Sequence, residues 1–171
     1  MHNPSDTIAA IITPRGTGAV SMLRISGPQA ISCVAHHFSK PQKLSKARTH
    51  TVHFGIFADT DTKPVDEVVC ILYRKPYSYT GEDTIEICCH GNPMLANRIL
   101  QVLLEKCRLA EPGEFTQRAY LNGKMDLSQA EAVNDLIQAK TFQAGHSALG
   151  QLQGFLAKGL GSLLERITNL R

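Results

Sequence analysis

The stretch DTIEICCHGNPMLANRILQVLLEKC, residues 83–107, decides the fold class of this chain. Residues 84–89 alternate in polarity, as in a strand with one buried side, because successive side chains of a strand point to opposite faces. Asn92 and Pro93 then give the start signal of a helix, and apolar residues recur at helical spacing up to Cys107. A strand that turns directly into an amphipathic helix predicts an α+β fold.

The residues before this stretch predict more strands and one helix. The helix follows Pro28 and has an apolar stripe that ends at Phe38, and the polar residues 41–49 are expected to form a loop. Short apolar or alternating runs predict strands at 7–12, 19–25, 52–57 and 65–73. Together these elements predict a mixed β-sheet with packed helices over residues 1–124.

The C-terminal part of the chain is expected to be helical. Ser128 followed by Glu131 is the pattern of a capping box, so a helix should start there and Lys124 should lie on the loop before it. An apolar stripe continues from Leu149 to Leu170, but five glycines weaken the helix, which therefore either needs neighbouring helices or bends or breaks near Gly145. Residues 125–171 are therefore expected to be the first helices of a truncated all-helical domain.

Composition excludes several classes of protein. With 171 residues and a net charge of +3, the chain does not have the strongly basic balance of a dedicated nucleic-acid-binding domain. Its four clustered cations, Lys40, Lys43, Lys46 and Arg48, are interpreted as a solvated loop. No apolar run reaches the length of a membrane span, and five cysteines without a repeated spacing indicate a reducing cytoplasm.

No complete catalytic constellation is visible in the sequence. The phosphate-binding pattern G-x-x-x-x-G-K-[ST] is absent from it. Cys88 and Cys89 are neighbours in a strand and should face opposite ways, which disfavours a shared metal ion. His90 either lines a pocket or fixes the turn before Gly91. We therefore assign neither catalytic nor metal-binding residues.

Three charged residues need an explanation. Arg24 interrupts an apolar strand, so it pairs either with a protein carboxylate or with a ligand carboxylate. Glu82 follows the turn at Thr80-Gly81 and is solvated, caps that turn, or accepts hydrogen bonds from a ring amide and its amine, as in a pterin. Lys124, before a helix start, is either a surface lysine or an anion contact.

Three segments, in the same order, resemble the N-terminal domain of the MnmE (TrmE) family of tRNA-modification GTPases. They are DTIAAIITPRGTGAVSMLRISGP (residues 6–28), YTGEDTIEICCHGNP (residues 79–93) and EPGEFTQRAYLNGKMDLSQAEAVNDLI (residues 111–137). The resemblance covers nearly the whole chain. It implies a fold similar to folate-binding domains of the aminomethyltransferase type, and it implies a constitutive homodimer.

The same resemblance implies a ligand. Family members bind 5-formyltetrahydrofolate in this domain, and a methylenetetrahydrofolate supplies their one-carbon unit. The family positions that contact folate correspond here to Arg24, Glu82 and Lys124.

The family's wider function needs more than this chain. The resemblance implies a separate G domain with GTP, K⁺ and Mg²⁺, and a partner, MnmG, which carries FAD. Together the two proteins add aminomethyl or carboxymethylaminomethyl groups at carbon 5 of the wobble uridine of tRNA. Because the G domain is absent, we expect no GTP hydrolysis by this chain.

The chain departs from the family pattern in three places. Residues 13–18 read TPRGTG, where family members often have TPPGRG. Asn92 replaces the second glycine of CHGG; asparagine can still adopt a left-handed backbone there, which would preserve the turn. The link after Cys107 is shorter than expected.

Two other functions fit the sequence. One is a free-standing folate-dependent one-carbon transferase, and the other is an interaction scaffold that has lost its ligand. Folate binding separates the scaffold from the other two possibilities, and a downstream GTPase phosphate loop would separate the first two.

Overall fold

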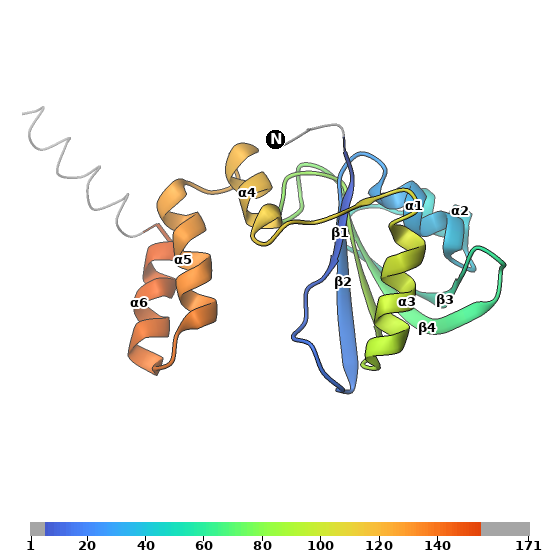
Figure 1. Ribbon diagram of the computed structural model, residues 1–171. Helices are drawn as coiled ribbons and strands as arrows, with labels where there is room; N and C mark the ends of the chain where they lie inside the picture. The colour runs from blue at the N-terminus through green and yellow to red at the C-terminus, as the bar shows by residue number, and fades with distance from the viewer. Residues whose placement is uncertain (1–5, 155–171) are drawn as a thin grey trace, which may run out of the picture. The chain divides into compact units, whose positions relative to one another are not determined.

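A mixed β-sheet forms the centre of the N-terminal part of the molecule (Figure 1). The computed structural model describes residues 6–154, and the chain divides into two units, residues 1–115 and residues 116–171. This division falls ahead of the boundary expected at residue 124.

The sheet has six strands in the order β3-β4-β5-β2-β1-β6. Neighbours are antiparallel except for the parallel pair of β1 and β6. The strands are β1 (Ile8–Ile11), β2 (Val20–Ser26), β3 (Thr51–Ala58), β4 (Pro64–Tyr73), β5 (Thr84–His90) and β6 (Arg108–Leu109). The predicted mixed sheet is confirmed, whereas β6, only two residues long, was not predicted.

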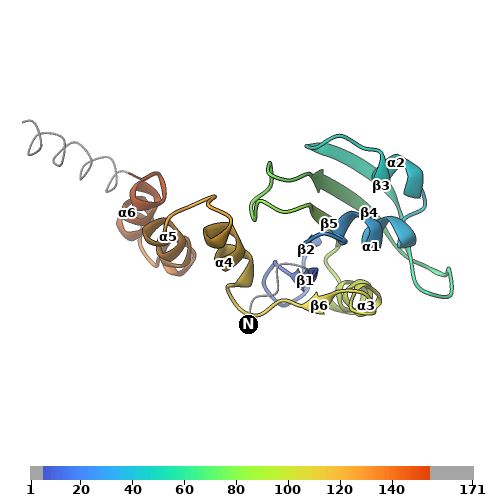
Figure 2. The same cartoon turned by 90° about the horizontal axis from the view of Figure 1, so that it is seen from above.

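Three helices pack on one side of the sheet, as Figure 2 shows from above: α1 (Ala30–His37), α2 (Pro41–Ser45) and α3 (Pro93–Leu103). The sheet residues under them alternate with outward-facing ones, so Leu23, Ile85 and Ile87 are fully buried. The loop predicted at 41–49 was wrong in its first half. Pro41 opens α2, and the helix buries Leu44 completely in the core.

Asn92 caps α3 and Pro93 opens it, as the sequence predicted. The φ of Asn92, −95°, is not left-handed, and its side-chain oxygen accepts a hydrogen bond from the Met94 N–H at 2.9 Å. Asn92 therefore serves as the N-cap of α3, and it replaces a glycine without needing glycine's backbone freedom.

The second unit contains α5 (Leu127–Gln138) and α6 (Phe142–Leu152), which pack on each other; α4 (Glu114–Leu121) spans the division. The predicted cap at Ser128 was wrong. Asp126 is the N-cap of α5, and it forms a capping box with Gln129. The helices break at residues 139–141 rather than at Gly145, which lies inside α6. The apolar stripe predicted beyond residue 154 lies outside the described residues.

The side of the sheet away from α1 and α3 carries many apolar side chains. On the edge strand β3, Val52 and Phe54 are 66% and 58% exposed, and Val20 on β2 is 59% exposed. The strand register sets Phe54 beside Val69, Val69 beside Cys88, and Cys88 beside Met22. We call this side the open face of the sheet.

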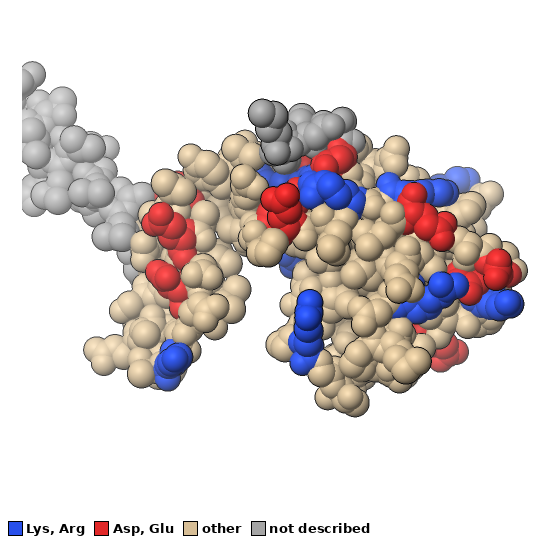
Figure 3. Space-filling view, viewed as in Figure 1, with Lys and Arg blue, Asp and Glu red and all other residues tan. Residues whose placement is uncertain are grey.

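Charged side chains are distributed without a single dominant sign on the side of the molecule drawn in Figure 3. There, Lys and Arg side chains of the first unit are interspersed with Asp and Glu side chains. Between residues 6 and 154, no helix has the length and apolar character needed to cross a membrane.

Candidate functional site

Arg24 lies on the open face and is paired with a protein carboxylate. It stands directly opposite Glu86 in the register of β2 and β5. Its Nε donates a hydrogen bond to Glu86 Oε1 at 2.9 Å, and its Nη2 lies 2.7 Å from the same oxygen. The sequence left open whether Arg24 pairs with a protein carboxylate or with a ligand carboxylate. The structure contains the first of these pairs.

Two aromatic rings lie against the guanidinium of Arg24. Its central carbon is 4.8 Å from the ring centroid of Tyr79 and 5.4 Å from that of Phe115. Both distances are within the range of cation–π attraction. Within residues 6–154, the Nη1 group of Arg24 donates no hydrogen bond, so a donor remains for another molecule.

Tyr73 belongs to the same surroundings. Burial raises the pKa of its phenol above the ordinary value, and the negative charge of Glu86 raises it further. Arg24 acts in the opposite direction on this pKa. The three side chains thus form one electrostatic group on the open face.

Glu82 lies on the loop before β5, and side chains beneath it hold its carboxylate. The hydroxyl of Ser26 donates a hydrogen bond to Glu82 Oε2 at 2.8 Å. Ser26 is fully buried and also contacts the Thr80 hydroxyl at 2.6 Å and the Thr84 hydroxyl at 3.3 Å. Gly81 has a φ of +79°, a conformation that favours glycine, and so permits the turn that brings Glu82 back over β2.

The strand β2 brings Arg24 and Glu82 to one part of the open face. Ser26 follows Arg24 by two residues, and side chains at that spacing line the same face of a strand, about 7 Å apart along it. Because Ser26 holds Glu82 and Glu86 holds Arg24, this strand carries one fixed guanidinium and anchors one fixed carboxylate on the same face. Such a pair can accept from, and donate to, one polar ring edge.

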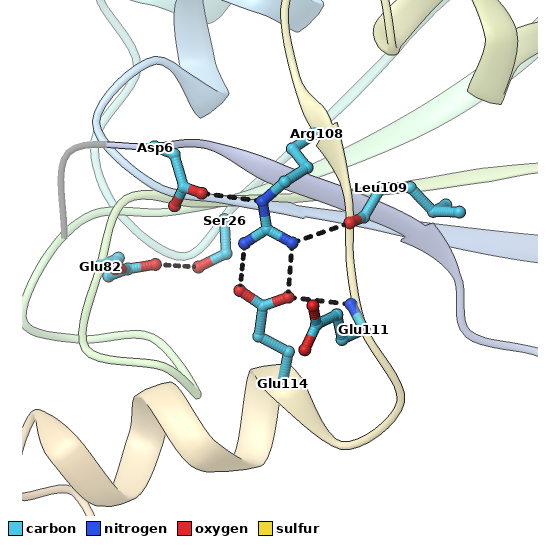
Figure 4. A network of polar contacts seen from close by, with 7 residues as sticks. All are labelled: Asp6, Ser26, Glu82, Arg108, Leu109, Glu111 and Glu114. Carbon is cyan, nitrogen blue, oxygen red and sulfur yellow. Dashed lines mark hydrogen bonds and ion pairs between the residues drawn. The ribbon is translucent and has the colours of Figure 1, made fainter. Parts of the chain in front are cut away.

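A third polar group, drawn in Figure 4, fixes the segment that leads into α4. Arg108 Nη1 and Nη2 donate to the two carboxylate oxygens of Glu114 at 3.0 and 2.5 Å, and its Nε donates to Asp6 at 2.9 Å. Glu114 also accepts from the Glu111 N–H at 2.8 Å. Sequence reasoning missed Arg108 because its partner Asp6 is 102 residues away in the chain.

Lys124 lies in the second unit, on the loop between α4 and α5, as the sequence predicted. Its N–H donates to the Ala119 carbonyl at 2.9 Å, and the preceding Gly123 has a φ of +68°. The loop therefore closes the end of α4 and sets the place of Lys124 within its own unit.

His90 contacts Asp66, whose carboxylate accepts from the His90 N–H at 2.8 Å and lies 2.7 Å from its Nδ1. Asp66 thus holds the end of β5 before the turn, which supports the structural interpretation of His90. The thiols of Cys88 and Cys89 face opposite sides, as predicted. Burial raises the pKa of Cys89 to about 11, and the nearby charges of Asp66 and Cys88 act in the same direction.

A hollow of about 820 Å³ lies in the first unit between the β1–β2 loop, α3 and the segment before α4. Its lining is mostly apolar and includes neither Arg24 nor Glu82. Phe115 lines this hollow and also contacts Arg24. The charged pair predicted from the sequence is therefore on the open face, outside this hollow.

Comparison with known proteins gives one consistent family. Residues 7–124 match the family model described as GTP-binding protein TrmE N-terminus. The chain is similar to proteins named tRNA modification GTPase MnmE. It is 47% identical to the one from Exiguobacterium sibiricum over 165 residues, and 50% identical to the one from Enterococcus faecalis over 167 residues.

These alignments cover 95% and 96% of this chain but only 36% of each relative. The chain therefore spans about a third of the length of the curated relatives it matches. The matched region includes Arg24, Glu82 and Lys124. By this match the chain belongs to the TrmE N-terminal family and corresponds to the N-terminal domain of the tRNA-modification GTPase MnmE.

Proposed function

We propose that this chain binds a reduced folate one-carbon donor, 5-formyltetrahydrofolate or a methylenetetrahydrofolate, through Arg24 and Glu82. One observation carries the proposal: Ser26, two residues after Arg24 on β2, holds the carboxylate of Glu82 at 2.8 Å. A guanidinium and a carboxylate are therefore preorganised on one face before any ligand arrives.

The chemistry of a pterin fits this pair. Its ring amide N–H and exocyclic amine are adjacent donors, and a carboxylate such as that of Glu82 accepts from both. Arg24 keeps its Nη1 donor for an oxygen of the same molecule. When bound, the folate would supply the one-carbon unit, and the role of these side chains is to bind and orient it.

Lys124 is proposed as a further folate contact on the basis of the family resemblance. A lysine is a flexible point charge and suits the carboxylate tail of a folate. Its contribution is tested separately by Lys124→Ala.

We also propose that the chain forms a homodimer through the open face. Monomers rarely leave large apolar patches exposed, and Val20, Val52 and Phe54 are all more than half exposed there. A second copy is the occupant that the family resemblance favours. An isologous contact would place the same apolar strands of both copies against each other.

The activity of the longer protein is a further proposal. In that protein, this module would work in the cytoplasm beside a G domain that binds GTP, K⁺ and Mg²⁺. With MnmG and its FAD, it would take part in adding aminomethyl or carboxymethylaminomethyl groups to the wobble uridine of tRNA. The relatives' name, tRNA modification GTPase, supports this assignment.

The test is a calorimetric titration of the chain with 5-formyltetrahydrofolate, with its mass in solution measured alongside. We expect saturable binding to a dimer, and we expect Glu82→Ala to weaken it with little change in melting temperature. Unchanged affinity with a collapse in stability would show that Glu82 is structural. A dimer that binds no folate would favour the interaction scaffold, and one-carbon transfer by the chain alone would favour a free-standing transferase.

A further inference from the structure

Glu86 restrains the guanidinium of Arg24 more firmly than a partner in an ordinary surface ion pair would. One of its oxygens receives both the Nε and the Nη2 of Arg24, at 2.9 and 2.7 Å. The two side chains are only 19% and 13% exposed, so water and salt screen them less than they screen a surface pair. The register of β2 and β5 fixes their backbones opposite each other.

The rings of Tyr79 and Phe115 also restrain the guanidinium of Arg24. They lie 4.8 and 5.4 Å from the guanidinium carbon, so they restrain the group by packing as well as by charge. Glu86 occupies the Nε–Nη2 edge of the guanidinium. Nη1 is then the donor group that remains without a hydrogen bond inside residues 6–154.

We propose that Glu86 is a positioning residue of the folate site, which holds Arg24 so that Nη1 meets an oxygen of the bound molecule. This inference rests on the proposed function. Arginine has a long side chain with high rotamer entropy, and a restrained guanidinium loses less entropy when it binds. Glu86 itself acts through Arg24 and needs no contact with the ligand.

Positioning and simple charge attraction predict opposite results for Glu86→Gln. The ligand carries carboxylates, so removal of a nearby negative charge would strengthen its binding if attraction were the only effect. Glutamine has nearly the same shape but loses the charge-assisted fork to Arg24. If Glu86 positions Arg24, this variant binds 5-formyltetrahydrofolate about tenfold more weakly.

The experiment is a calorimetric double-mutant cycle on the whole chain with 5-formyltetrahydrofolate. The variants are Glu86→Gln, Arg24→Ala and the two combined, with melting temperatures recorded for each. We expect Glu86→Gln to cause no further loss once Arg24 is alanine, because its effect passes through Arg24. Glu67→Gln is the matched control, since Glu67 is an exposed carboxylate on the same face and makes no side-chain hydrogen bond or ion pair with any residue between 6 and 154.

Two results of the cycle would overturn the inference. One is equal or tighter binding by Glu86→Gln, and the other is independent, multiplying losses in the combined variant. Equal weakening by Glu67→Gln would also overturn it, because the loss of affinity would then not depend on a contact with Arg24.

A second measurement needs no ligand and separates this inference from the proposed function. Relaxation of the Arg24 Nε–H signal in ¹⁵N NMR, assigned with Arg24→Lys, reports how rigid the guanidinium is. We expect an ordered Nε–H in the native chain and a mobile one in Glu86→Gln. If the native chain binds no folate, the proposed function fails. Even then, a more mobile Arg24 Nε–H in Glu86→Gln would support the positioning of Arg24 by Glu86. An Nε–H that is equally ordered in both would overturn the inference.

Discussion

The Ser26 hydroxyl donates a hydrogen bond of 2.8 Å to the Glu82 carboxylate, although 56 residues separate them in the chain. This contact ties the loop before β5 to the middle of the sheet. It also anchors the Glu82 carboxylate to β2, the strand that carries Arg24.

Ser26→Ala tests that contact. The change removes a donor from Glu82 and leaves the Thr80 and Thr84 hydroxyls to bond with each other across 3.3 Å. We expect a loss of about 1 kcal/mol in the free energy of unfolding, the usual net value of one hydrogen bond. We also expect weaker binding of 5-formyltetrahydrofolate. Denaturant unfolding and calorimetry measure the two effects, and unchanged affinity would argue against a role for Ser26 in holding Glu82.

Gly91→Ala should destabilise the first unit. A Cβ at Gly91 would overlap the backbone of Gly18 and lie 2.8 Å from the Val20 N, while the hydrogen bonds of Gly91 to Gly18 and Ala19 hold the two segments together. We expect a cost of about 1–3 kcal/mol, as for other overpacked sites.

The matched control for this change is Gly18→Ala. A Cβ at Gly18 would meet Val20 O at 3.7 Å, an ordinary contact. Urea unfolding of both variants compares them directly. Equal stability of the two variants would mean that the backbone around Gly91 shifts at little energetic cost, and that the close approach to Gly18 is not required for stability.

Asp126→Ala should destabilise α5 more than Ser128→Ala does. Asp126 is the observed N-cap, whereas the Ser128 hydroxyl only donates a hydrogen bond to Asp126 at 2.7 Å. The Gln129 N–H and then the Ser128 hydroxyl hold the pKa of Asp126 below its ordinary value of 3.8. A lowered carboxyl pKa adds stability at pH values above 3.8, and that stability is lost as pH falls through the lowered pKa.

Helical circular dichroism during melting, at neutral pH and at pH values below 3.8, measures the effect of this cap. The difference between Asp126→Ala and the native chain should shrink at the acidic values. If Ser128→Ala lost more helical stability than Asp126→Ala, Ser128 would be the cap of α5, as the sequence suggested.

His37 should make the first unit less stable in mild acid. Burial lowers its pKa most, the neighbouring charge of His36 lowers it further, and its ring stacks on Phe57 with centroids 5.6 Å apart. A lowered histidine pKa means that the unfolded chain takes up the proton first. Its stabilising effect is complete above the ordinary value of 6.5 and declines as pH falls below it.

Melting temperatures between pH 7.5 and pH 5 should therefore fall, and His37→Asn should reduce the size of that fall. His36→Asn, an exposed change on the same helix, should reduce the fall less, because the charge of His36 is a smaller cause of the lowered His37 pKa than burial is. A fall that is equally steep in His37→Asn would assign the pH dependence to other groups.

The local sequence pattern was enough to predict several of the regular strands and helices. Alternation in residues 84–89 and the Asn92-Pro93 start signal correctly gave β5 and α3, since both depend on neighbours along the chain. The same approach missed α2, which is short and mostly polar, and α4, half of whose eight residues are polar. For α2, burial of Leu44 in the core outweighs a weak local preference.

The sequence by itself determined the α+β class and most strands, and it singled out Arg24, Glu82 and Lys124 as charges that need an explanation; the family resemblance then predicted a folate contact for all three. Only the tertiary structure decided that Arg24 pairs with Glu86, that Ser26 holds Glu82, and that Arg108 joins Asp6 to Glu114. Apart from the Arg108–Glu114 contact, each of these depends on strand order and register across long separations in the chain. Local sequence encodes which face a side chain takes, but it does not encode which distant strand will lie beside it.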